Sequence, residues 1–167
     1  ERNKFAEVIL LKNKKPSFAM QMIIDKKADC VIGGAKCSTA EFLRPAFKII
    51  GLKKGVSRAS SFCLLYKGKQ TFFIADPAVN FDPTPEQIAE IGYLVAKHAE
   101  LLGFKPKIAM LSYSTAGSAK GESAQKMKKA TALLKKKLAN NKSAIVEGEI
   151  QLDAAVKPEI AIRKNKN

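Results

Sequence analysis

The chain has 167 residues, enough for one domain with a sizeable core, and 46% of them are apolar. No apolar run approaches the roughly 20 residues that cross a bilayer, residues 1–15 are too charged for a signal peptide, and three cysteines without CxxC spacing argue against a disulfide framework or a zinc site. The formal net charge of +15 predicts anionic partners, but no RNA- or DNA-reading motif is present, so we expect a cytoplasmic protein without membrane or specific nucleic-acid contacts.

The first two predicted elements are a helix and a strand. Residues 17–27 predict a helix with one apolar face, and residues 29–32 predict a short strand that ends at a pair of glycines. Small and hydroxylic residues, among them Ser38 and Thr39, follow the glycines. The strand is therefore expected to lead into a bend whose backbone a ligand can approach closely.

A broken helix is predicted over residues 39–50, and Gly51 ends it. Arg44 directly precedes Pro45, and a residue before proline disfavours helical geometry. We expect the helix to restart there with Pro45 at its first position. Arg44 would then lie near a new helix N-terminus, where its guanidinium can form a two-pronged pair with phosphate. A surface arginine on a kinked helix is the alternative.

The middle of the chain predicts a hairpin and a long helix. Residues 59–66 and 70–75 have the pattern of two strands joined by a tight turn. The helix after Thr84 is the clearest in the chain, because Thr84 is a good N-cap, Pro85 suits the first helical position and Gln87 completes a capping box.

The last third alternates strands and helices. Residues 107–113 and 144–152 predict strands on either side of an amphipathic helix over residues 121–138, and residues 154–163 begin another helix. This order indicates an α/β chain with a mostly parallel sheet and flanking helices.

A domain boundary is predicted near residues 51–57, where Gly-Leu-Lys-Lys-Gly interrupts the pattern. It would separate part of a first α/β lobe, residues 1–54, from a second lobe, residues 55–167. Residues 120–142 carry eight lysines against one acid. A solvated helix face is the simplest interpretation of this run, and a surface for a small anionic ligand is the alternative.

Two bends share one design. The first contains Ser38 and Thr39, and the second, SYSTAGSAKG, spans residues 112–121 after a predicted strand. In both, small residues admit a ligand, hydroxyls donate hydrogen bonds, and a helix N-terminus follows. Neither is a P-loop or a dinucleotide fingerprint, yet together they predict an anion site.

Several polar residues near these bends have two interpretations. Ser38, with Glu41 three residues later, fits a simple capping box, and Ser118 fits a cap as well. Asp76 and Asn80 follow the end of a predicted strand. They are either contacts for a ligand or residues that brace the loop.

Two further side chains, Cys37 and His98, are considered for a role in catalysis. Cys37 lies next to the first bend. It is either a reactive thiol or a small residue that packs in the interior. The single histidine, His98, is expected on an exposed helix position, so histidine-based catalysis is not predicted.

Four long stretches resemble successive blocks of the phosphate acetyltransferase and butyryltransferase family, in the family's order and spacing. They are CSTAEFLRPAFKIIG, FIADPAVNFDPTPEQIAEI, IAMLSYSTAGSAKG and EGEIQLDAAVKPEIA. The resemblance implies reversible acyl transfer between coenzyme A and inorganic phosphate. It also implies a two-lobed architecture like that of isocitrate and isopropylmalate dehydrogenases, here incomplete, and a homodimer. Coenzyme A is then a substrate, and no tightly bound cofactor or metal is expected.

The resemblance implies site residues as well. Ser38, Thr39 and Arg44 match the family motif that contacts phosphate or acyl phosphate. Asn80 matches a polar position in the block between the two motifs. The second loop that lines the family's cleft is matched by Ser112, Ser114, Thr115, Gly117 and Ser118. In the implied mechanism a base deprotonates the thiol of coenzyme A, the thiolate attacks the acyl-phosphate carbonyl, and arginines stabilise the departing phosphate.

The chain departs from the family's pattern in two places. Cys37 stands where the family usually has histidine. The family's catalytic aspartate and a Ser-Arg pair lie in a C-terminal block that this chain does not contain, so no catalytic residue is assigned here and the segment alone is expected to be inactive. Arg2 is a candidate for an upstream arginine of the family.

Three alternatives stay open. One is a non-catalytic domain that senses acetyl-CoA, like the transferase-like domain of bacterial malic enzymes. Another is a phosphate butyryltransferase, since two methylenes change the burial energy by only about 1.6 kcal/mol and no residue is identified that selects the acyl group. The third is a basic nucleic-acid binder.

Overall fold

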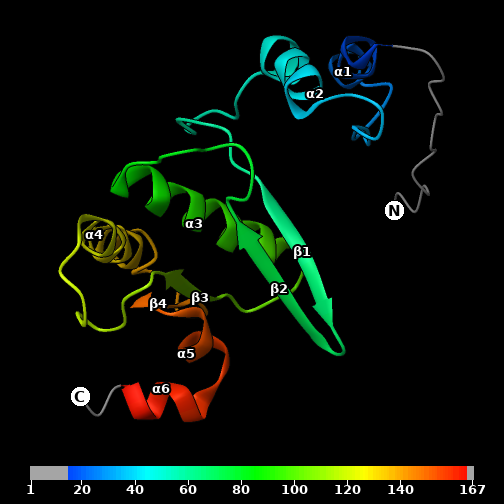
Figure 1. Ribbon diagram of the computed structural model, residues 1–167. Coiled ribbons are helices and arrows are strands. Elements are labelled where there is room, and N and C mark those ends of the chain that lie inside the picture. The colour runs from blue at the N-terminus through cyan, green and yellow to red at the C-terminus, as the bar shows by residue number, and fades with distance from the viewer. Residues whose placement is uncertain (1–14, 165–167) are drawn as a thin grey trace. The chain divides into compact units, whose positions relative to one another are not determined.

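The computed structural model describes residues 15–164, and the chain divides into two compact units, residues 1–58 and 59–167 (Figure 1). The first unit contains α1 (Pro16–Ile24), α2 (Thr39–Pro45) and the π-helical turn η1 (Ala46–Ile50). α1 packs against α2 and η1, and Met20 of α1 is only 2% exposed. The assignment of residues 1–54 and 55–167 to two lobes stays a prediction.

The strand predicted over residues 29–32 is wrong. These residues pair with no other strand, and the side chain of Ile32 is 90% exposed. A strand is stabilised by cross-strand pairs and by burial of at least one face, and this segment has neither. The first bend therefore does not follow the end of a strand.

The interruption of the helix at Pro45 differs from the predicted restart. Arg44 keeps helical geometry within α2, and Pro45 is the last residue of α2 instead of the first of a new helix. The chain continues as η1, in which the N–H of Gly51 donates to the carbonyl of Ala46 at 3.0 Å. Proline lacks an N–H and crowds the carbonyl four residues earlier, so a wider π turn accommodates it. Gly51, with φ 77°, ends the helix as predicted.

The second unit combines helices with two small sheets. In chain order its elements are β1 (Phe62–Lys67), β2 (Gln70–Ala75), α3 (Pro85–Leu101), β3 (Lys107–Leu111), α4 (Glu122–Lys137), β4 (Ile145–Ile150), α5 (Leu152–Val156) and α6 (Pro158–Lys164). β1 and β2 form the predicted antiparallel hairpin, whereas β3 and β4 are parallel neighbours. The α/β class is confirmed. Of the described strands only β3 and β4 are parallel, so the predicted mostly parallel sheet is not confirmed.

The helix predicted from residue 154 onward is divided into α5 and α6. Lys157 between them is extended, with φ −126° and ψ 106°, as expected for the residue before Pro158. No helix within residues 15–164 is long and apolar enough to cross a membrane.

Both ends of α3 follow the predicted local chemistry. The N–H of Thr84 donates to Oε1 of Gln87 at 2.8 Å, and the N–H of Gln87 donates to Oγ1 of Thr84 at 3.4 Å. At the other end the N–H of Gly103 donates to the carbonyl of Glu100 at 2.9 Å. Gly103 has φ 84°, a left-handed conformation that glycine adopts at little cost.

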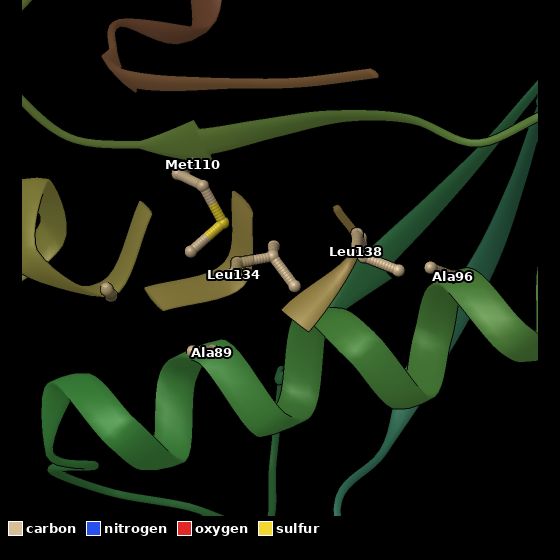
Figure 2. Close-up of a cluster of buried hydrophobic side chains, with 6 residues drawn as sticks. Ala89, Ala96, Met110, Leu134 and Leu138 are labelled. Carbon is tan, nitrogen blue, oxygen red and sulfur yellow. The ribbon is translucent and has the colours of Figure 1, made fainter. Parts of the chain in front are cut away.

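The core of the second unit lies where α4 packs on the sheet of β3 and β4 and α3 packs on α4 (Figure 2). Its buried side chains are Ala89, Ala96, Met110, Ala130, Leu134 and Leu138. A methyl group on Gly92 of α3 would lie 2.7 Å from Cδ2 of Leu134. This glycine therefore lets the two helices approach closely enough to enclose Leu134, which is 0% exposed.

Asp76 and Asn80 brace the loop after β2. Oδ1 of Asp76 accepts hydrogen bonds from the hydroxyl of Ser61 at 2.6 Å and from the N–H groups of Ala78 at 3.0 Å and Val79 at 3.1 Å. The side-chain amide of Asn80 donates to the other carboxylate oxygen. Burial raises the pKa of Asp76, but these hydrogen bonds outweigh it and lower the pKa to about 2.

Replacing Leu134 by alanine should lower the free energy of unfolding by about 2–5 kcal/mol, because it removes fully buried methyl groups and leaves a cavity. Lys135→Ala, on the exposed side of the same helix, should change it by less than about 0.5 kcal/mol. Urea unfolding followed by circular dichroism measures both. Equal losses in the two variants would contradict the core described above.

Replacing Asp76 by asparagine should lower the free energy of unfolding at pH 7 by about 1–2 kcal/mol, because a charged acceptor of several hydrogen bonds is lost. The folded-state pKa is about 2 against an ordinary 3.8, so the wild-type advantage is fully present above about pH 4 and is lost as the pH falls toward 2. Unfolding curves between pH 7 and pH 2 measure the difference.

Asp82→Asn serves as the control for Asp76, because the side chain of Asp82 is 73% exposed and an exposed ion pair contributes only about 0–1 kcal/mol. A wild-type advantage over Asp76→Asn that stays constant down to pH 2 would be inconsistent with the lowered pKa.

Candidate functional site

The first bend is closed by a carboxylate of its own helix. The N–H of Ser38 donates to Oε2 of Glu41 at 2.7 Å, the Ser38 hydroxyl donates to the same oxygen at 2.8 Å, and the N–H of Glu41 donates to Oγ of Ser38 at 3.3 Å. The capping-box interpretation of Ser38 is confirmed. A negative charge from the chain itself therefore occupies the N-terminus of α2, where an external phosphate was expected.

Arg44 belongs to the same electrostatic group as Glu41. The backbone and side-chain hydrogen bonds from Ser38 lower the pKa of Glu41 most, and Coulomb attraction to Arg44 lowers it further. Arg44 and Thr39 are exposed to solvent, and Cys37 is a half-buried free thiol. The first unit thus keeps Ser38, Thr39 and Arg44 on one short helix, with Thr39 and Arg44 open to a ligand. Arg2 lies outside the described residues.

The second bend, residues 112–120, follows β3 and is partly buried. Ser114 and Thr115 are 0% and 7% exposed, whereas Gly117 and Ser118 are exposed. The hydroxyls of Ser114 and Ser118 are 3.3 Å apart, and Oγ of Ser118 also accepts the N–H of Thr115 at 3.1 Å. Hydrogen bonds within the bend therefore bring the predicted hydroxyls together.

Ser112 and Ser118 have roles inside this bend. The N–H of Ser114 donates to Oγ of Ser112 at 3.2 Å. The cap interpretation of Ser118 is wrong, because the N-cap of α4 is Gly121. A methyl group on Gly121 would lie 2.2 Å from the hydroxyl of Tyr113, so this glycine lets the bend fold back against the start of α4.

A buried carboxylate, Glu149 near the end of β4, lies beneath the second bend. Its Oε1 accepts the N–H of Gly117 at 2.5 Å and the hydroxyl of Ser114 at 3.4 Å, and the residue is 5% exposed. Sequence reasoning missed Glu149, because the partners of an acid within a strand cannot be known before the fold. The one signal that could have found it was its place at the carboxyl end of a strand, the edge at which ligands of α/β sheets collect.

Gln151 supports the same bend from the residue after β4. Its N–H donates to Oγ1 of Thr115 at 3.0 Å, and the Thr115 hydroxyl donates back to Oε1 of Gln151 at 3.2 Å. The ammonium group of Lys164 donates to that Oε1 at 3.0 Å. Thr115 is therefore held by two hydrogen bonds to Gln151, and sequence reasoning gave no reason to pair these residues.

The predicted site residues fall into two groups. Ser38, Thr39 and Arg44 lie in the first unit, and the others lie in the second. Within the second unit one hydrogen-bonded group contains Ser112, Ser114, Thr115, Gly117 and Ser118. Asn80 belongs to the brace around Asp76 instead.

Other polar groups lie away from these bends or face solvent. A polar pocket at the C-terminal ends of α3 and α4 is lined by Tyr93, Lys97, Glu100, Lys137, Leu138, Asn140 and Asn141. Two lysines of α4, Lys126 and Lys129, pair with acids at or just before the start of α3, and its last three lysines are exposed. His98 is exposed, as predicted. Within residues 15–164 no cluster of three or more histidine, cysteine or acidic side chains could hold a metal ion.

Comparison with known proteins agrees with the order of the motifs. The family model for phosphate acetyl/butaryl transferase matches residues 3–167. A phosphate acetyltransferase of Staphylococcus aureus (strain Mu50) is 39% identical over 155 residues, which cover 92% of this chain and 47% of that protein. This chain thus spans about half the length of the curated relatives it matches.

Two solved structures are similar in fold. The EutD phosphotransacetylase from Staphylococcus aureus has a TM-score of 0.79 at 39% identity, over 89% of this chain and 46% of that one. A phosphotransacetylase from Streptococcus pyogenes has a TM-score of 0.76 at 37% identity, over 89% and 45%. With a family model that matches nearly every residue, this chain belongs to the phosphate acetyl/butaryl transferase family.

Proposed function

We propose that the protein to which this chain belongs is a phosphate acetyltransferase, which moves an acetyl group reversibly between coenzyme A and inorganic phosphate. The match of the family model to residues 3–167, with phosphate acetyltransferases among the relatives at 39% identity, carries this proposal. In the direction of acetyl-CoA synthesis, a base takes the thiol proton and the thiolate sulfur bonds to the acetyl carbon. The bond from that carbon to the phosphate oxygen then breaks, and phosphate departs.

Arg44 and Thr39 are the best-placed phosphate contacts of the first unit. The hydroxyl of Ser38 is engaged by the carboxylate of Glu41 at 2.8 Å, so Ser38 reaches a phosphate only if it exchanges that partner. The exposed guanidinium of Arg44 can bind two phosphate oxygens at once and neutralise the charge that develops on the leaving group. The Ser38 cap then serves to fix the start of the helix that carries Arg44.

The bend after β3 is proposed to meet coenzyme A. Its exposed residues, Gly117 and Ser118, are the candidates for direct contact, and the buried Ser114 and Thr115 shape the bend from beneath. Ser112 and Asn80 complete the set that matches the family's cleft. Coenzyme A acts here as a substrate, and the reaction involves no redox step, so we propose no tightly bound cofactor and no metal.

The finer architecture is also a proposal. From the family resemblance we propose two α/β lobes of the isocitrate and isopropylmalate dehydrogenase type with a substrate cleft between them, paired as a homodimer. We place the protein in the cytoplasm, where coenzyme A and acetyl phosphate are formed and consumed.

The full-length protein should consume coenzyme A when given acetyl phosphate, and release phosphate in equal amount. The 167-residue chain alone should show negligible turnover. Loss of free thiol, measured with a colorimetric thiol reagent, follows the reaction. Robust turnover by the 167-residue chain would contradict the prediction for the segment, and acetyl-CoA binding without turnover by the full-length protein would instead favour the sensing domain.

Arg44→Ala in the full-length protein should lower kcat/KM for acetyl phosphate about 100-fold, because one charged donor to the departing phosphate is removed. Arg163→Ala is the matched control, since Arg163 is an exposed arginine in the last turn of α6, and it should leave kcat/KM unchanged. Steady-state kinetics with both substrates varied give these values. Equal effects of the two substitutions would remove Arg44 from the site.

A further inference from the structure

We propose that Glu149 is a positioning residue of the acyl-transfer site, whose buried carboxylate holds the bend after β3 in the shape that meets coenzyme A. The part of this proposal that concerns coenzyme A rests on the proposed function. The part that concerns the shape of the bend rests on the contacts of Glu149 alone.

An irregularity in the strand directs Glu149 under the bend. The ladder between β3 and β4 pairs Met110 with Gly148 but Leu111 with Ile150, so Glu149 has no partner in the ladder. An extra residue of this kind redirects its side chain. Gly148 makes the irregularity possible, because a methyl group there would lie 2.5 Å from Cβ of Met110. Two residues earlier, Glu147 stays exposed.

Glu149 contacts the part of the bend that most needs support. Ala116 and Gly117 both have positive φ, 50° and 82°, and a residue with a Cβ disfavours that conformation. The backbone carbonyl of Glu149 accepts the N–H of Ala116 at 3.2 Å, and its carboxylate accepts the N–H of Gly117 at 2.5 Å. Both residues of the bend that have positive φ therefore donate their backbone N–H to Glu149.

The charge of Glu149 also sets the direction of the hydroxyl hydrogen bonds. An ionised carboxylate can only accept, so the hydroxyl of Ser114 donates to Glu149 over 3.4 Å. Oγ of Ser114 then accepts from the N–H of Ala119 at 3.1 Å and from the hydroxyl of Ser118 at 3.3 Å. This arrangement uses the full hydrogen-bonding capacity of Ser114, which leaves substrate contact to the exposed side of the bend.

Stability alone does not account for a carboxylate at this place. No ion pair to Glu149 is found within residues 15–164, and burying a charge without a cation is costly. A glutamine of the same size would be easier to bury, and its Oε1 could accept the same two bonds, but a neutral oxygen accepts them less strongly than a carboxylate does. The negative charge therefore strengthens the hold on the bend at a cost in burial.

Glu149→Gln in the full-length protein tests the proposal, with Glu147→Gln as the matched control that removes the same charge from an exposed position of the same strand. Hydrogen exchange, followed by mass spectrometry on peptides covering residues 112–120, should become about tenfold faster in Glu149→Gln, because a neutral acceptor replaces a charged one and the hydrogen bond from Gly117 weakens. In the same variant KM for coenzyme A should rise about tenfold, while KM for acetyl phosphate stays within twofold. Glu147→Gln should match the wild type in all three measurements.

Unchanged exchange in Glu149→Gln overturns the proposal, and so does faster exchange with an unchanged KM for coenzyme A. If the wild-type protein neither binds nor turns over coenzyme A, the proposed function fails, and the exchange measurement still decides whether Glu149 holds the bend. Should Glu149→Gln not fold, Ser114→Ala removes the hydroxyl that donates to Glu149, together with its bonds to Ala119 and Ser118, and keeps the charge. It should then give faster exchange of the same peptides and a raised KM for coenzyme A, and wild-type values would overturn the proposal.

Discussion

Both hydroxyl-rich bends of this chain are held by carboxylates of the chain itself. Glu41 accepts the N–H and hydroxyl of Ser38, and Glu149 accepts the N–H of Gly117 and the hydroxyl of Ser114. Backbone and hydroxyl donors in a bend must be satisfied before any substrate arrives. An internal acceptor meets that requirement, and it gives each bend a fixed shape in the absence of a ligand. These bends, whose donors are already satisfied, carry the exposed side chains of Thr39, Arg44 and Ser118.

The two carboxylates differ in what they hold. Glu41 caps a short exposed helix, a local arrangement whose partners are three residues apart. Glu149 joins two segments that are far apart in the chain, because its partner Ser114 lies 35 residues away. The second bend therefore depends on the sheet of β3 and β4 and on the helix α4 that packs on this sheet. At Gly92 and Gly148 the neighbouring side chains leave no room for a methyl group.

Under the proposed function, the two bends meet two different anionic substrates. A buried carboxylate beneath the second bend disfavours a second negative charge close by, which suits a contact with the neutral arm of coenzyme A better than one with phosphate. In that proposal Arg44 supplies the positive charge for phosphate, and each bend meets a different substrate.

The sequence by itself determined the local features and the family. Caps, helix stops and the hairpin turn depend on residues three to five positions apart, so the Ser38 and Thr84 caps, Gly51, Gly103 and the β1–β2 pairing were predictable. Only the tertiary structure decided that residues 29–32 form no strand, that Arg44 stays helical before Pro45, and that Glu149 and Gln151 hold residues 35 and 36 positions away. Those outcomes depend on pairing, burial and a shift of strand register, which exist only once distant segments meet.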